Sequence, residues 1–192
     1  MGTEEEDGTG RSRQRRGSAT RSLLRRLCKA RRGAVMVEFA LLMLPFFILL
    51  FGVFEVALLI WGGLELDNAT ADAARLVRTG QAQAAGYDAA DLRQAVCSRV
   101  SLLFECNSRL RVDVQTFPSF QITLPAALDP QGRLKQAFAF DLGQGGSIVL
   151  MTTFYEWPLL SILSSISLSN MADGNILLSA SAAFRNEPFS DR

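Results

Sequence analysis

Apolar residues change their spacing along this chain, and each spacing predicts a different element. Residues 39–64 form an almost unbroken apolar run in which Glu55 is the only charged residue. Apolar positions then recur at three- and four-residue spacing up to Gly80, which is typical of an amphipathic helix that ends at a glycine. These positions are Leu66, Ala69, Ala73, Leu76 and Val77. Beyond residue 108 apolar and polar residues alternate, which predicts strands. The pattern predicts an α+β protein, in which a long helix extends into a small head containing a second helix and an antiparallel sheet.

The apolar run is long enough to cross a membrane as a helix. At about 1.5 Å per residue, the uncharged residues 39–54 cover about 24 Å, close to a hydrocarbon core once their neighbours are added. Pro45 has no amide hydrogen to donate to the carbonyl of Leu41, so we expect the helix to bend there. Gly52 offers a point of close approach for another helix. Glu55 falls near the far side of the bilayer, where we expect its carboxylate to reach the interface.

A second helix is predicted in the head, with Asp88 as its N-cap. Its apolar positions are Leu92, Val96, Val100 and Leu103. Cys97 lies on this helix and Cys106 lies just past it. In an extracytoplasmic compartment the two cysteines can form a disulfide if the chain turns back after Phe104, and otherwise they remain thiols. Two thiols without a histidine make a poor metal site, so no metal is expected there.

The predicted strands cover four segments, 109–117, 119–124, 147–160 and 175–184. A turn at Pro118–Ser119 is expected between the first two. The third is the most continuously apolar, as expected of a central strand. The glycine-rich residues 141–147 open a strand rather than a helix and no lysine follows them, so we interpret them as a β-turn and not as a phosphate loop. Residues 159–169 fit either an amphipathic surface or a short helix.

Charge is distributed unevenly and predicts the orientation of the helix. Residues 1–33 carry ten basic and four acidic residues, a net charge of +6, whereas residues 34–192 carry ten basic and fifteen acidic residues, a net charge of −5. The basic segment lacks an apolar period and is predicted to be disordered. The positive-inside rule places it in the cytoplasm and the residues after about 65 outside. A plain single-pass anchor and a cleaved secretory signal are alternative interpretations, although the run is longer than a signal peptide's apolar region.

The chain has no histidine, which removes the commonest general base and the commonest metal ligand. Lys135 is the only lysine beyond the basic segment. No catalytic residue, metal or cofactor is assigned from the sequence, and we predict that the protein is not an enzyme.

The start of the apolar run resembles a known processing site. The stretch "RRGAVMVEFALLMLP" is similar to type IV pilin precursors, in particular to Flp-type prepilins of the tight-adherence (Tad) system, and residues 33–80 resemble the TadE-like pseudopilins. The resemblance implies that a prepilin peptidase cuts after Gly33, which makes Ala34 the first residue and Glu38 the fifth, followed by Phe39. It also implies that Glu38 meets the amino terminus of a neighbouring subunit, and that Pro45, Gly52 and Glu55 belong to the assembly segment.

Two segments of the head carry the resemblance further. Residues 155–158, "YEWP", resemble a strand end of the family that serves in packing, and residues 184–189, "FRNEPF", resemble its C-terminal motif. Within that motif we expect Arg185 and Glu187 to pair and Pro188 to end the strand.

The resemblance implies a division of the chain and a role. The expected parts are a cleaved basic cytoplasmic leader at 1–33, a transmembrane helix continuing as an amphipathic helix at 34–80, and an extracytoplasmic α+β head at 81–192. The implied role is that of a minor pseudopilin in the bacterial inner membrane, incorporated into or initiating a pilus. Its implied partners are the membrane, the prepilin peptidase, other pseudopilins, the major Flp pilin and the pilus assembly platform, without direct nucleic-acid contact. A membrane-anchored extracytoplasmic binding module or enzyme is the alternative interpretation.

Overall fold

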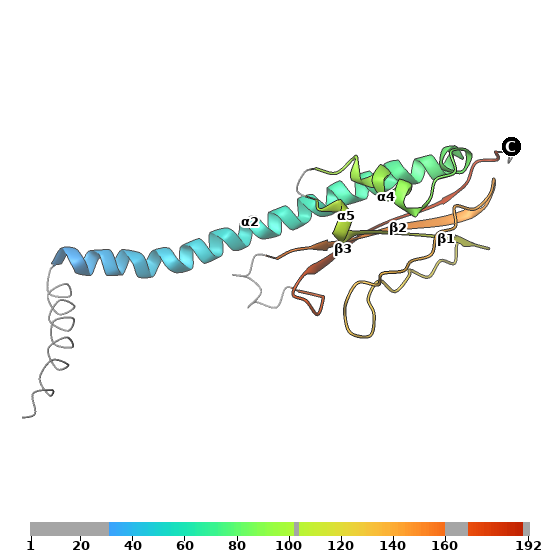
Figure 1. Ribbon diagram of the computed structural model, residues 1–192. Helices are drawn as coiled ribbons and strands as arrows, with labels where there is room; N and C mark the ends of the chain where they lie inside the picture. Colours follow the sequence, from blue (N-terminus) through green and yellow to red (C-terminus); the bar gives the residue numbers. More distant parts are fainter. Residues whose placement is uncertain (1–30, 102–103, 160–168, 190–192) are drawn as a thin grey trace, which may run out of the picture. The chain divides into compact units, whose positions relative to one another are not determined.

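The structure is a computed structural model, and it describes residues 31–101, 104–159 and 169–189. The chain divides into two compact units, residues 1–51 and 52–192, and each is considered on its own. The elements, all but α3 labelled in Figure 1, are α2 (Arg31–Arg78), α3 (Gln81–Ala84), α4 (Ala89–Cys97), α5 (Cys106–Arg109), β1 (Leu110–Phe117), β2 (Ile148–Trp157) and β3 (Ile176–Arg185). This is the predicted α+β class. The leader, expected to be disordered, and residues 159–169, expected to form either an amphipathic surface or a short helix, lie largely outside the described residues.

The predicted long helix is confirmed as α2, which has 48 residues and contains Pro45. Its part from Val35 onward is long and apolar enough to cross a membrane. Nearly all the large apolar side chains of this helix up to Leu64 are exposed, including Leu42 at 66%. A helix whose apolar side chains face outward has no core of its own to pack against, which is the arrangement expected for a lipid-facing segment.

The C-terminal part of α2 packs in the opposite way, as one wall of the head's core. Leu66, Ala69, Ala73 and Val77, which were identified by their helical spacing, are all at most 2% exposed. Gly62 lies under the indole of Trp157, so closely that an added Cβ would be 2.7 Å from the ring. The helix stops at Arg78, and Gly80 follows with a φ of 77°, a left-handed conformation that glycine adopts without strain.

Helix α4 begins as predicted and ends earlier. Asp88 is the N-cap, and its side chain and that of Asp91 exchange hydrogen bonds with each other's backbone amides in a capping box. The prediction that the helix continues through Val100 was wrong, because the last helical residue is Cys97. The chain turns away there towards α5, where Cys106 lies.

The sheet has three antiparallel strands in the order β1-β2-β3. The predicted central strand is confirmed as β2, in which eight of ten residues are buried. Val114 of β1 pairs with Met151, and Met151 pairs with Ala182 of β3, in the register that turns alternate residues towards α2 and α4. Aromatic packing of Phe104, Tyr155 and Trp157 closes one end of this core, with ring centroids 4.6–6.1 Å apart.

The predicted strand at 119–124 was wrong. The structure has no strand there, and Phe120 and Leu124 are exposed. The outer edge of β1 instead pairs briefly with residues around Phe140, because the amide of Val114 donates to Ala139 and its carbonyl accepts from Asp141. A partner that arrives from more than twenty residues away cannot be identified from local alternation.

Candidate membrane assembly site

The residues expected to be processed lie at the start of α2. Gly33 and Ala34 are helical, within three residues of the helix's first described residue, Arg31. A protease that draws its substrate into an extended strand must therefore unwind this turn of the helix.

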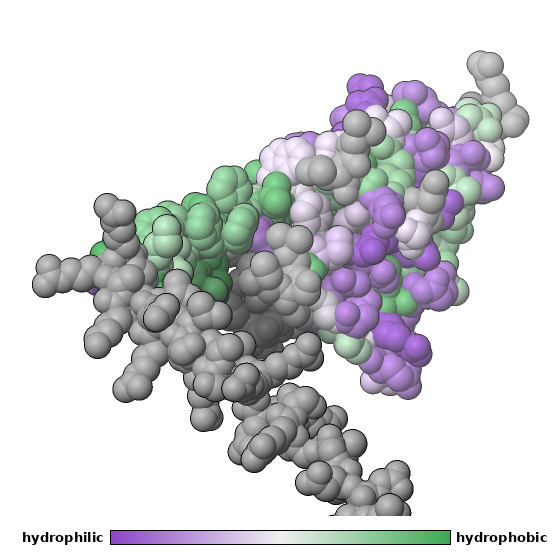
Figure 2. All heavy atoms as spheres, turned by 60° about the vertical axis from the view of Figure 1, so that its left-hand side comes forward, coloured by the Kyte–Doolittle hydropathy of each residue, from purple (hydrophilic) through white to green (hydrophobic). Residues whose placement is uncertain are grey.

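Glu38 and Phe39 follow on α2 and are both exposed, Phe39 at 59%. Leu42 lies four residues after Glu38 and therefore on the same helix face. The carboxylate is thus surrounded along the helix by exposed apolar side chains. Figure 2 shows how continuously apolar atoms, in green, gather along this helix.

Pro45 and Gly52 lie further along α2. The helix continues through Pro45, and the bend expected there stays a prediction. Gly52 is the first residue of the second compact unit, so it marks the point from which α2 is grouped with the head.

Glu55 differs from its expected position. Its side chain is 2% exposed, whereas we expected it to reach the membrane interface. The helical spacing places Glu55 and Leu59, which packs against the core, on one face, and this face turns inward. The carboxylate of Glu55 is therefore buried, whereas Glu38 is the exposed carboxylate of the apolar segment.

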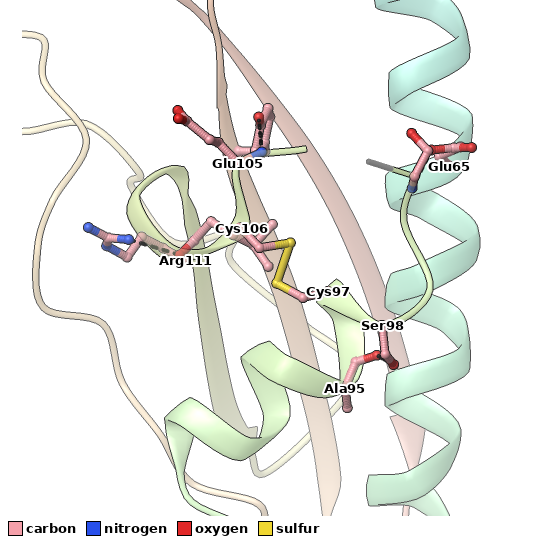
Figure 3. The surroundings of a disulfide bond; sticks show 10 residues. Glu65, Ala95, Cys97, Ser98, Glu105, Cys106 and Arg111 are labelled. Atoms are coloured by element: carbon pink, nitrogen blue, oxygen red, sulfur yellow. Dashed lines mark hydrogen bonds between the residues drawn. A yellow bond between two sulfur atoms is a disulfide. The ribbon is translucent and has the colours of Figure 1, made fainter. Parts of the chain in front are cut away.

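The segment between α4 and α5 fastens the head to α2, as Figure 3 shows. The structure has a disulfide between Cys97 and Cys106, whose Cα atoms are 5.8 Å apart. Between them, the amide of Ser101 donates to Oε2 of Glu65 at 3.1 Å. The amide of Glu105 donates to the hydroxyl of Tyr155 at 2.9 Å. Burial raises the pKa of Tyr155 above its ordinary value, so its hydroxyl stays neutral.

The C-terminal motif "FRNEPF" closes the other end of the head. The side-chain amide of Asn186, which is 2% exposed, donates to the carbonyls of Leu142 and Gln144, both at 3.0 Å. The amide of Glu187 donates to the carbonyl of Arg78 at the end of α2. Phe189 covers Gly80, where an added Cβ would be 2.7 Å from its ring. The motif therefore ties β3 to the last turn of α2.

The expected pair of Arg185 and Glu187 was wrong. The guanidinium of Arg185 donates to the carbonyl of Gly146, and Glu187 lies 3.7 Å from Arg78. The sequence did not identify Asn186 as the central residue of the motif. An asparagine between a strand and an X-Pro pair was the available signal, because its side-chain amide can satisfy carbonyls of a neighbouring loop.

The described part of the chain contains no group of three or more His, Cys, Asp or Glu side chains that could hold a metal ion. What the geometry offers is an exposed apolar helix with a carboxylate near its start, followed by a head with its own core.

Residues 33–75 match the family model of TadE-like proteins. The resemblance is thereby confirmed over this TadE-like segment, which indicates involvement in the Tad pilus system. Proteins of this family are pilus components, and the family is not known as one of enzymes. Among the described residues one helix is long and apolar enough to cross a membrane, which indicates single-pass anchoring. No curated protein and no solved structure matches the chain.

Proposed function

We propose that the protein is a minor pseudopilin of a Tad/Flp pilus apparatus in the bacterial inner membrane. The basic leader stays in the cytoplasm and the head is exported. Prepilin peptidase cuts between Gly33 and Ala34, and the mature protein then joins other pseudopilins and the major Flp pilin at the assembly platform, where it initiates or supports the fibre.

The observation that supports this proposal is the exposed apolar surface of α2 within the TadE-like segment. The large apolar side chains from Val35 to Ile60 are almost all exposed, and neighbouring helices or lipid must cover them. A lipid anchor alone would satisfy that requirement. The exposed carboxylate of Glu38 among them is costly in lipid, and a residue of this kind is by default functional.

Cleavage gives this carboxylate a partner. It creates an ammonium group at Ala34, and the same group on an adjacent subunit can meet Glu38 within the bilayer. An ion pair in apolar surroundings is strongly attractive but offsets its desolvation only with good geometry. We therefore expect the ion pair to fix the alignment of adjacent helices. They pair where the amine and the carboxylate meet, because any other alignment leaves both charges buried and unpaired.

The test is the mass of the protein recovered from host membranes, together with the yield of sheared fibres. We expect the mature chain to begin at Ala34, and Glu38→Gln to lower fibre yield by about tenfold or more, the factor that corresponds to 1.4 kcal/mol of association free energy. Glu156→Gln is the matched control, since it removes a carboxylate from the head and should leave the yield unchanged. Residues 1–33 still attached in the native host, or a normal yield from Glu38→Gln, would contradict the proposal.

A further inference from the structure

Two hollows adjoin on the surface of the head and share Gln136 and Ala137 in their walls. The first, of about 470 Å³, is lined by Asp129, Arg133 and Lys135. The second, of about 460 Å³, is lined by Arg93 of α4 and Arg111 of β1, and by no acidic residue. Each volume falls within the roughly 300–1,000 Å³ typical of small-molecule sites. The pair of hollows is called the basic groove below.

The basic groove is unusual because three of its four cations lack an ion pair among the described residues, although residues 34–192 have a net charge of −5. Among the described residues, Arg93, Arg111 and Lys135 form no ion pair, whereas Arg133 pairs with Asp129. Backbone amides, first that of Arg133, hold the pKa of Asp129 below its ordinary value, so this carboxylate stays ionised and offsets Arg133 alone.

The acidic residues nearest along α4 are engaged elsewhere. The carboxylate of Asp88 accepts from the amides of Ala90 and Asp91, and the carboxylate of Asp91 accepts from the amide of Asp88. Both are therefore used in starting the helix, and neither forms an ion pair with Arg93, so three cations of the basic groove have no ion pair among the described residues.

The other groups of the groove suit a sugar acid. The guanidinium of Arg111 is held by two neutral acceptors, the carbonyl of Leu110 at 2.9 Å and Oε1 of Gln136 at 3.1 Å, and so is oriented before any ligand arrives. Phe138 is half-buried with its ring stacked on Phe154, at a centroid distance of 5.1 Å. Its ring also lines the second hollow, where it offers a firm apolar surface next to the two guanidinium groups.

We propose that the basic groove binds an acidic polysaccharide through its uronic-acid carboxylates. A guanidinium group recognises a carboxylate with two parallel hydrogen bonds, the amide of Gln136 suits sugar hydroxyls, and the ring of Phe138 suits the C–H face of a pyranose. A nucleic acid fits less well. Duplex DNA carries one negative charge per ~1.7 Å, and a net-negative head with three free cations repels such a dense polyanion more than a polymer with one carboxylate per sugar.

The experiment measures binding of trigalacturonate to the full chain in detergent micelles by isothermal titration calorimetry. Neutral trigalactose and the peptide triglutamate are the comparison ligands. We expect trigalacturonate to bind and trigalactose not to bind. We expect Arg93→Gln and Lys135→Gln each to weaken binding by about tenfold, the loss expected for a charge-assisted hydrogen bond. Neither side chain makes a hydrogen bond in the described structure, so both variants should fold.

Arg75→Gln is the matched control, because Arg75 is exposed on α2, forms no ion pair among the described residues and lies outside the basic groove. It should change affinity by less than about twofold, since it alters only the net charge. An equal loss in Arg75→Gln would show unspecific charge attraction and overturn the proposal. Absence of trigalacturonate binding, or equal or tighter binding of triglutamate, would overturn it as well. None of these results depends on cleavage at Gly33, so the inference stands or falls separately from the pilus role.

Discussion

The segment of α2 up to Phe51 and the head from Gly52 onward differ in where their apolar side chains lie. The first exposes nearly all its apolar side chains and has no core of its own, whereas the second encloses a core between the end of α2, α4 and the sheet. In lipid a span must be helical and predominantly apolar along its whole length, which leaves a continuous signal in the sequence. A water-soluble head needs only a buried face, and many sequences satisfy that.

The family match crosses the boundary between these two regions. It covers residues 33–75, which is the apolar segment together with the part of α2 that forms a wall of the head, and it stops before α4 and the sheet. The basic groove lies in the part of the head beyond the match.

The strongest test of this difference is to replace one leucine by alanine in each of the two regions of α2. Leu66→Ala should lower the free energy of unfolding of the head by about 2–5 kcal/mol, because Leu66 is 1% exposed and its loss leaves a cavity. Leu42→Ala, at a site 66% exposed, should change it by less than about 0.5 kcal/mol. The measurement is urea unfolding of the full chain in detergent, followed by the fluorescence of Trp61 and Trp157. Equal losses in the two variants would mean that the apolar segment and the head do not differ in this way.

The next effect concerns the link between α4 and α5. Replacing both Cys97 and Cys106 by serine should cost about 2–3 kcal/mol, since the bond closes a short loop in the unfolded chain. The same urea titration with and without reductant measures it, and reductant should lower the midpoint of the parent but not of the double-serine variant. Insensitivity of the parent to reductant, with the thiols titratable, would show that the bond does not form.

The sequence predicted those elements whose patterns are local. The spacing of Leu66, Ala69 and Ala73 predicted the buried face of α2, the N-cap at Asp88 was correct, and the unbroken apolarity of β2 identified the central strand. Each of these signals lies within one element and needs no knowledge of a distant partner.

What could not be predicted depends on contacts between distant segments. The alternation at 119–124 suits a strand, but the edge of β1 is occupied by residues around Phe140. Helix α4 ends at Cys97 because the chain turns there towards Cys106 and Tyr155. Of the candidate site, the sequence supplied Glu38, which is exposed, but the burial of Glu55 depends on tertiary contacts that helical spacing does not reveal.

The smallest expected effect concerns the C-terminal motif and compares two adjacent residues. Asn186→Ala should lower the free energy of unfolding by about 1–2 kcal/mol, because two hydrogen bonds from its buried side-chain amide are lost. The carbonyl of Leu142 still accepts from Gln83 and that of Gln144 from the amide of Ser147, so neither is left without a donor. Glu187→Gln should change it by less than about 0.5 kcal/mol, since the pair with Arg78 is half-exposed at 3.7 Å and the backbone bond is untouched. The same urea titration separates the two variants. A larger loss in Glu187→Gln would mean that charge, rather than the amide of Asn186, fastens the end of the chain to α2, and the motif would then be expected to weaken with salt.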